Sequence, residues 1–297
     1  MIEVTYAGLQ TIIVTTRRHG MESLGVPNGG PMDVVSCILA NRLVGNDDTC
    51  GVLEMTLMPA GLLFRDACTV AITGGESAMF LTRAGIRMAV PMNETISIQP
   101  GDSLRGNCLN SGLRTYLAVS GGIVCESIRP TVLHKGDMIS CGCNKNVPCR
   151  TAVRPFPIPE KFRLLRVIEG AHISAFSTTG VNTFLTNTYT YRQESNRMGI
   201  RLNGAAIKFA EGCDGNIISE GVVPGDIQVS SDGLPIMMMA DCQTIGGYTK
   251  IAHLISADMP IAAQLRPGDR VRFRFVSVEE AQDALRKMKK TIDSSLR

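Results

Sequence analysis

Hydrogen-bonding side chains gather around a pair of adjacent glycines in the last third of the chain. Glycine has no side chain, so a ligand can approach its backbone closely and its N–H group can face an anion. Polar side chains beside such a pair supply the donors, acceptors and charge that an amide or a carboxylate requires. The segment therefore predicts one wall of a binding site, formed by Asp241, Gln243, Thr244, Gly246, Gly247, Tyr248 and Lys250.

Two carboxylates in this region, Asp241 and Glu220, are candidates for a base or a water-positioning group. Each stands next to a turn and beside apolar residues, and burial there would raise the pKa of a carboxyl group toward a useful range. The alternative is that each carboxylate only accepts hydrogen bonds from loop amides.

An acyl-transfer or amide reaction also places negative charge on a carbonyl oxygen, which preorganised donors must stabilise. The Gly246 and Gly247 amides are candidate donors, and Lys250 is the candidate cation. The alternative is a tight glycine turn with Lys250 in solvent.

Substrate-orienting groups are also present. The side chains of Gln228 and Gln243 each carry a donor and an acceptor, which would suit a substrate amide. Tyr248 would stack on a substrate or hydrogen-bond to it; the alternative is a core aromatic residue. Arg197 would hold a carboxylate through its forked donors, or else be an exposed arginine. In the first half, Asn28 and Gly30 belong to a loop that leads into a helix N-terminus, where anions bind.

A few helices and many strands are expected to position these groups. Asp33 is expected to cap a helix that ends before Gly45, and Ser277 with Glu280 forms a capping box at the start of the last helix. Residues 78–90 predict a hairpin that turns at Arg83-Ala84-Gly85, and residues 271–278 alternate as a half-buried strand does. Further turns are predicted at 223–226 (VPGD), 230–233 (SSDG) and 244–247 (TIGG).

A repeated motif indicates two related halves. Residues 98–104 and 265–271 both read apolar-x-Pro-Gly-Asp-x-apolar, and 134–138 is a looser copy. Proline and glycine at these positions favour a tight turn that leads into a strand; two chance turns are the alternative. The proline-rich stretch 146–160 predicts an extended linker. We therefore expect a mainly β protein with a few helices, built as two barrel-like lobes at 1–150 and 151–297.

Composition excludes several classes of protein. The chain has 297 residues, 44% of them hydrophobic, and a formal net charge of +3, which gives no argument for nucleic-acid binding. No run approaches the 18 apolar residues of a membrane span, and the first residues lack the pattern of a secretory signal, so a cytoplasmic protein is expected. The ten cysteines include Cys141, Cys143 and Cys149, a weak metal pattern with no histidine at ligand spacing, and no metal is expected.

Ordered motifs across nearly the whole chain resemble one family. In the first half they are 25–27 (GVP), 30–33 (GPMD), 40–46 (ANRLVGN), 53–56 (LEMT) and 116–123 (YLAVSGGI). In the second half they are 195–199 (SNRMG), 219–225 (SEGVVPG), 227–229 (IQV), 240–241 (AD) with 243–244 (QT) and 246–248 (GGY), 250–252 (KIA) and 264–269 (QLRPGD). The chain resembles the KipA, or allophanate-hydrolase-subunit-2, family of biotin-dependent carboxyltransferase domains, whose members include the C subunit of 5-oxoprolinase (PxpC) and a module of urea amidolyase.

The resemblance implies two cyclophilin-like β-barrel lobes and a KipI-like partner (the B subunit), with a LamB/YcsF-type third component in the oxoprolinase. That assembly opens the lactam 5-oxoproline to glutamate with ATP, while the amidolyase module moves a carboxyl group from biotin to urea. No phosphate-binding loop of the GxxxxGK[ST] type and no biotinyl-lysine motif occur here, so ATP is expected at an unconventional site or on a partner, and biotin only on another protein.

This chain departs from the family pattern at several places. The Gln and Asp of an early Gln-Asp-x-Gly-Arg-x-Gly element are missing from residues 14–20, a glycine-rich loop after Ile123 is shortened, and Cys242 replaces a usual arginine. Three hypotheses follow: a PxpC-like subunit of an ATP-dependent 5-oxoprolinase, a carboxyltransferase component, and a non-catalytic binding partner of a KipI-like protein.

Overall fold

The computed structural model describes residues 1–125, 131–142, 147–153 and 161–296, and it divides into two compact units. The first unit comprises Met1–Thr16, Asp33–Ile158 and Lys289–Arg297, and the second comprises Arg17–Met32 and Pro159–Met288. The division between Ile158 and Pro159 falls outside the described residues, so the boundary expected after residue 150 stays a prediction. The expected linker at 146–160 falls mostly outside the described residues.

The two compact units are not two continuous halves of the chain, because two segments belong to the unit of the other half. Arg17–Met32 belongs to the second unit, because Gly29 N donates to Ala240 O at 2.9 Å and Arg197 Nη2 donates to Gly30 O at 2.7 Å. The last nine residues, Lys289–Arg297, belong to the first unit, where Arg42 pairs with Asp293. A sequence pattern gives no sign of such exchanges, because they depend on contacts between distant segments.

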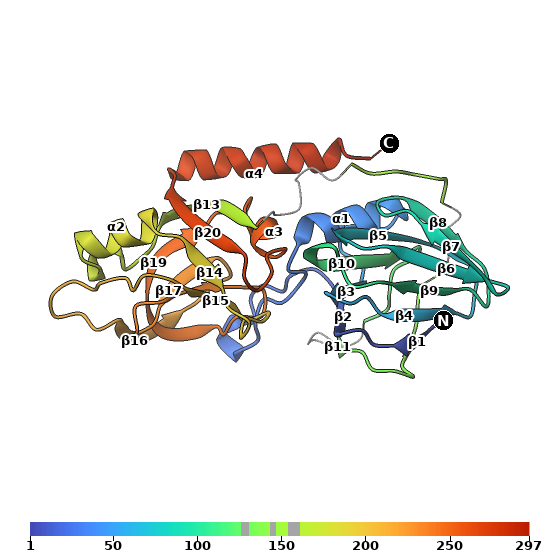
Figure 1. Cartoon of the computed structure of the whole chain (residues 1–297), viewed down its shortest axis with the longest axis horizontal. Coiled ribbons are helices and arrows are strands. Elements are labelled where there is room, and N and C mark those ends of the chain that lie inside the picture. The colour runs from blue at the N-terminus through green and yellow to red at the C-terminus, as the bar shows by residue number, and fades with distance from the viewer. Residues whose placement is uncertain (126–130, 143–146, 154–160, 297) are drawn as a thin grey trace. The chain divides into compact units, whose positions relative to one another are not determined.

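The first unit is a pair of six-stranded sheets around one core (Figure 1). Apolar side chains such as Val4 and Phe64 from one sheet pack with Ile72 and Leu117 from the other. One sheet has the order β12-β1-β4-β9-β6-β7, with β1 (Ile2–Tyr6), β4 (Gly61–Phe64), β6 (Met79–Arg83), β7 (Ile86–Val90), β9 (Ser103–Gly106) and β12 (Met138–Ile139). The other has the order β11-β2-β3-β10-β5-β8, with β2 (Gln10–Val14), β3 (Val52–Thr56), β5 (Cys68–Glu76), β8 (Thr95–Ile98), β10 (Ser111–Val119) and β11 (Thr131–Val132).

A single α-helix covers the second of these sheets. Helix α1 (Val34–Leu43) packs on β5 and β10. Asp33 caps it as expected: Oδ1 accepts from Ser36 N at 3.1 Å, and Oδ2 accepts from Ser36 Oγ at 2.6 Å. The helix ends before Gly45, whose φ of 69° lies in the left-handed region that glycine accepts without strain.

The second unit is a closed barrel. Its strands follow the order β13-β20-β14-β15-β18-β17-β19-β16, and an additional antiparallel pairing of β13 with β19 closes the ring and leaves β16 outside it. The strands are β13 (Phe162–Glu169), β14 (Tyr189–Tyr191), β15 (Gly199–Asn203), β16 (Asn216–Gly221), β17 (Asp226–Val229), β18 (Pro235–Met238), β19 (Ile245–Leu254) and β20 (Arg270–Phe275). Full closure removes most of the free edge that an open sheet exposes.

Helices complete this part of the chain. Helix α2 (Thr178–Thr186) packs on β20, and Phe184 stacks on Phe273 with ring centroids 4.5 Å apart. Short helices lie at η1 (Glu22–Leu24), η2 (Ile173–Ala175) and α3 (Met259–Ala262). Helix α4 (Val278–Asp293) opens with the predicted capping box, in which Ser277 N donates to Glu280 Oε2 at 2.9 Å and Glu280 N donates to Ser277 Oγ at 3.1 Å.

The repeated Pro-Gly-Asp motif is a turn that stabilises itself. In each copy the aspartate N–H donates to the carbonyl three residues earlier, and the carboxylate accepts from that same residue's N–H. The looser copy at 134–137 forms the same bonds, and the turn at 223–226 is a fourth copy. The glycines have φ values of 88°, 90°, 95° and 105° at Gly101, Gly268, Gly136 and Gly225.

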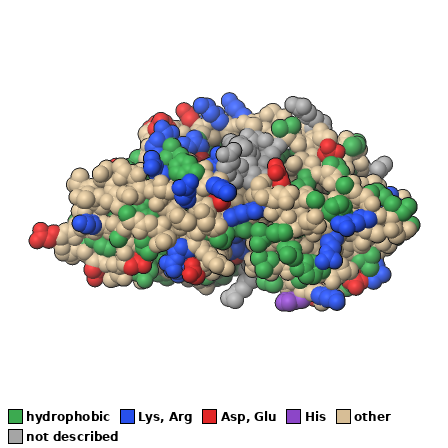
Figure 2. All heavy atoms as spheres, viewed as in Figure 1, with side chains coloured by type: hydrophobic (Ala, Val, Ile, Leu, Met, Phe, Trp, Pro, Cys, Tyr) green, Lys and Arg blue, Asp and Glu red, His purple; other side chains and the backbone are tan. Residues whose placement is uncertain are grey.

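The mainly β fold with a few helices is therefore confirmed. The hairpin β6–β7 turns at Ala84 and Gly85 as predicted, and the turn at 230–233 is present, with Gly233 N bonded to Ser230 O. The turn predicted at 244–247 is wrong, because Ile245 already begins β19. None of the helices that the structure describes is long and apolar enough to span a membrane. Figure 2 shows acidic and basic side chains interspersed on the face drawn, consistent with the formal net charge of +3.

Candidate functional site

A pocket of about 150 Å³ opens in the second unit between β15, β17, β18 and β19. Three of the predicted substrate-binding residues, Gln228, Gln243 and Tyr248, line it together. The other lining residues are Asn196, Met198, Gly199, Arg201, Ile236 and Met238. The pocket thus combines amide groups, an aromatic ring and a guanidinium group with a thioether and aliphatic wall, as sites for small polar ligands do.

Gln228 is the central polar group of this pocket. It lies on β17, opposite Lys250 on β19, and only 1% of its surface is exposed. Its Nε2 is buried and has no hydrogen-bond partner among the described residues. Leaving such a donor unpaired costs about 1–3 kcal/mol, and a bound oxygen acceptor would recover this cost.

Gly246 makes room for these amides. A Cβ atom on Gly246 would lie 2.9 Å from Gln228 Nε2, 3.0 Å from Val222 Cγ2 and 3.3 Å from Gln243 Nε2. Gly246 and Gly247 lie in strand β19 rather than in a turn, with Gly246 opposite Glu220 on β16. The alternative of a tight glycine turn is therefore wrong. The predicted donation of the two glycine N–H groups to a substrate stays a prediction.

Lys250 lies beside this pocket, in an ion cluster that the structure builds from three segments. Its Nζ lies 2.6 Å from Glu220 Oε1, donates to Gly221 O at 2.5 Å and lies 3.5 Å from Asp226 Oδ2. Only 9% of the Lys250 side chain is exposed, so the alternative of a lysine in solvent is wrong. Glu220 and Gly221 thus accept hydrogen bonds from the ammonium group, while Asp226 contributes a longer ion pair.

Two histidines extend the cluster. Lys250 N donates to His172 Nδ1 at 3.2 Å, which places the ring proton of a neutral His172 on Nε2, 3.6 Å from Glu220 Oε2. His253 Nδ1 lies 2.9 Å from Asp226 Oδ1. The His253 ring can approach residue 225 closely because glycine has no Cβ atom. A Cβ at this position would lie only 2.8 Å from His253 Nε2.

The charges in this cluster hold its carboxylates ionised. The hydrogen bond from Lys250 lowers the pKa of Glu220 below its ordinary value of 4.5. The expectation that burial would raise it is wrong, because 41% of that side chain is exposed. For Asp226, burial raises the pKa, but His253, the Val223 N–H and Lys250 outweigh it and the net pKa lies below 3.8. Both groups are therefore anions at neutral pH, suited to hold the lysine in place.

The remaining predicted residues gather elsewhere in the second unit. Arg197 Nε and Nη2 lie 2.7 and 3.0 Å from the two carboxylate oxygens of Asp241, and only 7% of the arginine side chain is exposed. The alternative of an exposed arginine is therefore wrong. The same guanidinium group binds Gly30 O, so Arg197, Asp241 and Gly30 together tie segment 17–32 to the barrel. Their predicted catalytic and substrate-binding roles stay predictions.

Two further predicted residues lie in the backbone framework. Asn28 Nδ2 donates to Arg18 O at 3.0 Å and to Glu22 Oε1 at 2.9 Å, and so holds the loop that contains it. Thr244 O accepts from Val222 N at 2.9 Å and joins the loop before β19 to the one after β16. Neither residue is among those that line the pocket.

Sequence reasoning missed several residues that the fold brings to the site. Asp226 was assigned only to a turn, and His172 and His253 were not paired with any carboxylate. The i, i+2 spacing of Asp226 and Gln228 on β17 is a signal that could have placed them on one face of a strand. From the motif 195–199, Arg197 was chosen, whereas its neighbours Asn196, Met198 and Gly199 line the pocket.

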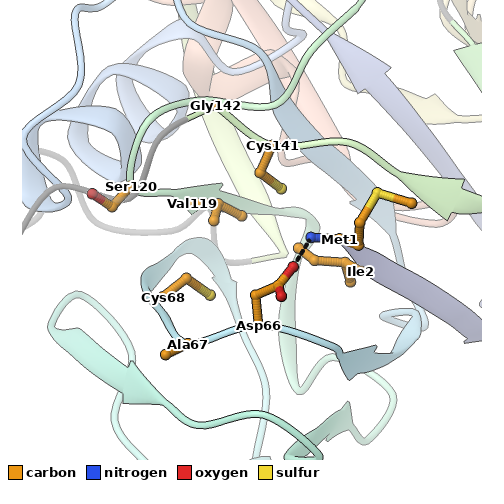
Figure 3. A pocket seen from close by; sticks show the side chains of 9 residues that line it. All are labelled: Met1, Ile2, Asp66, Ala67, Cys68, Val119, Ser120, Cys141 and Gly142. Carbon is orange, nitrogen blue, oxygen red and sulfur yellow. Dashed lines mark hydrogen bonds and ion pairs between the residues drawn. The ribbon is translucent and has the colours of Figure 1, made fainter.

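Cys242 and a second hollow carry no reactive group. Burial raises the pKa of the Cys242 thiol to about 12, and it packs beside Val222 and Met238. Figure 3 shows a hollow of about 140 Å³ in the first unit, where the Met1 ammonium group is bound by Asp66 at 2.8 Å. Burial raises the pKa of its thiols Cys68 (to about 12) and Cys141, so both stay protonated. Within the described residues, no three potential metal ligands lie together.

Comparison with known proteins now assigns the family. The model of the carboxyltransferase domain, subdomain A and B, matches residues 24–275. The chain belongs to this carboxyltransferase domain family. The match includes all twelve predicted site residues together with the pocket and the ion cluster.

Individual relatives of this family cover almost the whole chain. The chain is 30% identical to the C subunit of 5-oxoprolinase from Escherichia coli K12, over 96% of this chain and 94% of that protein. It is 27% identical to the C subunit of 5-oxoprolinase from Haemophilus influenzae, over 97% and 95%. The crystal structure of Kluyveromyces lactis urea amidolyase superposes with a TM-score of 0.90 at 28% identity, covering 99% of this chain and 20% of that one.

In this member of the carboxyltransferase domain family, two first-half motifs have a structural role. Asn46 Nδ2 donates to Val119 O at 2.8 Å and to Asn41 Oδ1 at 3.1 Å, while its Oδ1 accepts from Gly121 N at 2.9 Å. This buried network joins motif 40–46 to motif 116–123.

Proposed function

We propose that this chain is a PxpC-like subunit of a multi-component, ATP-dependent 5-oxoprolinase, which opens a lactam ring to glutamate. It would work with a KipI-like B subunit and a third, LamB/YcsF-type subunit. Two features support this: the chain and its E. coli relative cover each other nearly end to end, and a small pocket in the second unit presents an unpaired amide donor.

The pocket chemistry suits a cyclic amide. A lactam has one carbonyl oxygen and one N–H group, which a glutamine side chain complements with its Nε2 donor and Oε1 acceptor. In the proposed complex, the buried Gln228 Nε2 donates to the lactam carbonyl oxygen, where negative charge grows as the carbonyl carbon is attacked. Gln243 and Tyr248 complete the wall. Loss of one such donor typically lowers the rate by about 10²–10³-fold.

Lys250 serves as a positioning residue in this proposal. Its ammonium group binds Glu220 and Gly221 and forms an ion pair with Asp226, so it fixes β16, β17 and β19 relative to one another. These strands carry Gln228, Gly246 and Tyr248. The ion cluster therefore holds the amide donor and the ring wall in register.

ATP would activate the amide oxygen by phosphorylation or drive the reaction from another subunit. The amide pocket of about 150 Å³ is smaller than the roughly 300–1,000 Å³ of sites for drug-sized ligands, so we place the nucleotide outside it. A cytoplasmic location, where these substrates occur, is part of the same proposal.

The test is an assay of the reconstituted complex. The chain is co-expressed with its KipI-like and LamB/YcsF-type partners, and 5-oxoproline-dependent ATP hydrolysis is measured for the wild type and for Gln228→Met. This substitution nearly keeps the side-chain volume but removes both the amide donor and the amide acceptor. We expect at least a tenfold loss of activity in Gln228→Met and none in Gln282→Met, a matched change on the exposed surface of α4. A complex without 5-oxoproline-dependent hydrolysis would reject the proposal.

Carboxyl transfer is the second candidate, and the superposition with urea amidolyase favours it. Urea and the ureido ring of biotin also present a carbonyl oxygen beside N–H groups, so the same pocket would bind them. Transfer of a carboxyl group from free or carrier-bound carboxybiotin to urea, in the absence of oxoprolinase activity, would support this function. If neither activity appears but a KipI-like protein still binds, the chain is a non-catalytic partner.

A further inference from the structure

A broad groove of about 650 Å³ lies on the first unit, over strands β1, β6, β7 and β9. Figure 1 shows these strands as neighbours in one sheet with β4. The groove is lined by Tyr6, Met58, Phe80, Thr82, Arg87, Ser103, Arg105, Gly106, Asn107 and Cys108. It shares no residue with the amide pocket, and the inference below does not depend on the proposed function.

The strand register gathers the polar groups of this groove on one face. Phe80 lies opposite Arg105, and Thr82 lies opposite both Ser103 and Arg87. Because side chains alternate along a strand, these residues share the face away from the core. Their neighbours Met79, Leu81 and Leu104 are buried on the other face.

Both arginines are stacked on aromatic rings. Arg87 Cζ lies 3.8 Å from the centroid of the Phe80 ring, and Arg105 Cζ lies 5.1 Å from that of Tyr6. Tyr6 is itself fixed, since its hydroxyl donates to Met58 Sδ at 2.7 Å. A guanidinium group that lies flat on a ring keeps its edge N–H groups free to bind an anion.

The groove supplies donors and no carboxylate. Neither Arg87 nor Arg105 forms an ion pair within the part of the chain that is described, and no acidic side chain lines the groove. Thr82, Ser103 and Asn107 add two hydroxyl groups and an amide. One guanidinium group is enough to bind a single carboxylate through two hydrogen bonds. Two guanidinium groups with several neutral donors therefore suit an anion with more oxygen atoms.

We propose that this groove binds the di- or triphosphate group of a small molecule. The two guanidinium groups would contact separate phosphates, and the hydroxyl and amide donors would bind the remaining oxygens. The volume of the groove admits a nucleoside as well as the phosphates. The proposed ligand group is the di- or triphosphate, and the experiment distinguishes an inorganic polyphosphate from a nucleotide.

The test is calorimetric titration of the purified full chain with inorganic pyrophosphate, inorganic triphosphate and ATP. We expect saturable binding, weakened about tenfold or more in Arg87→Gln and in Arg105→Gln, because each removes charge-assisted hydrogen bonds. Lys135→Gln removes the same charge from an exposed turn of the same unit and should bind as the wild type does. Tighter binding of ATP than of triphosphate identifies a nucleotide, and equal binding identifies the inorganic group.

Thermal unfolding of each variant accompanies the titrations. If an arginine variant does not fold, Asn107→Ala and Ser103→Ala, which keep both stacked pairs, replace it and should weaken binding by at least threefold together. Absence of saturable binding at millimolar ligand would overturn the proposal. An equal loss of affinity in Lys135→Gln would also overturn the proposal, because it would show that the ligand responds only to the general positive charge of the surface.

Discussion

Lys250 Nζ lies 2.6 Å from Glu220 Oε1 and 3.5 Å from Asp226 Oδ2, so that one ammonium group joins strand β19 to both β16 and β17. The two carboxylates differ in environment: 41% of the Glu220 side chain is exposed, but only 9% of Asp226. Their contributions to stability should differ accordingly.

Lys250→Met should destabilise the second unit. The substitution leaves the mostly buried Asp226 carboxylate without its ammonium partner, and breaking a buried ion pair costs about 3 kcal/mol. Glu220→Gln should cost less than about 1 kcal/mol, since that carboxylate is well exposed. Urea unfolding gives both values, with Lys290→Met on the exposed face of α4 as the control. Equal values for Lys250→Met and Lys290→Met would contradict the assigned cluster.

Asp226 should contribute to the loss of stability in acid. Its pKa in the folded chain lies below the ordinary value of 3.8, so its contribution is present above that value and disappears as the pH falls through the lower folded value. Asp226→Asn should therefore be less stable at neutral pH and lose less stability below about pH 4. Asp283→Asn, on the exposed surface of α4, should retain the acid response of the wild type. Unfolding free energies measured between pH 2 and 7 check this, and a parallel curve for Asp226→Asn would refute it.

Gly246→Ala should impair the amide pocket more than the fold. The added methyl group meets Gln228 Nε2 at 2.9 Å and Val222 Cγ2 at 3.0 Å, which forces side-chain shifts that cost about 1–3 kcal/mol. Gly221→Ala is the matched control, because a Cβ there has no atom within 4 Å. In the reconstituted enzyme we expect the KM for the lactam to rise several-fold in Gly246→Ala alone. An unchanged KM would exclude Gly246 from the substrate site.

The cysteines should differ sharply in reactivity. Cys242 is 2% exposed, and burial raises its pKa to about 12, so it should resist alkylation by iodoacetamide at pH 8. The exposed Cys108, Cys149 and Cys213 should react. Peptide mass spectrometry after a short labelling time measures each site. Rapid labelling of Cys242 in the folded chain would show that the loop before β19 opens.

Losing the capping box of α4 should have a local effect. Ser277→Ala removes the acceptor for Glu280 N and should cost about 1 kcal/mol. Thr291→Ala near the other end of the helix serves as a comparison. The change in thermal midpoint, measured by circular dichroism, should be small for Ser277→Ala relative to Lys250→Met. If the thermal midpoint falls further in Ser277→Ala than in Lys250→Met, the effect of the cap is not local and α4 contributes substantially to global stability.

The local features of this fold follow from short stretches of sequence. Asp33, Gly45, the Ser277–Glu280 pair and the Pro-Gly-Asp turns act through partners within four residues, and each was placed correctly. Gln228 and Tyr248, chosen from the sequence for their polar groups, lie in one pocket because β17 and β19 pair in the fold. Where prediction failed, at the supposed turn 244–247, pairing with β16 overrode the turn preference of two glycines.

The sequence by itself determined the caps, the turns, the mainly β character and the family, because these depend on local geometry or on motifs read in order. Only the tertiary structure decided that Lys250 is neutralised by Glu220 and Asp226, that Arg197 binds Asp241, and that segment 17–32 belongs to the second unit. Those outcomes depend on strand register and barrel closure, which set distances between residues far apart in the chain. A lysine or an arginine in the sequence could bind a substrate or form a structural ion pair, and the distances in the fold show which side chains pair.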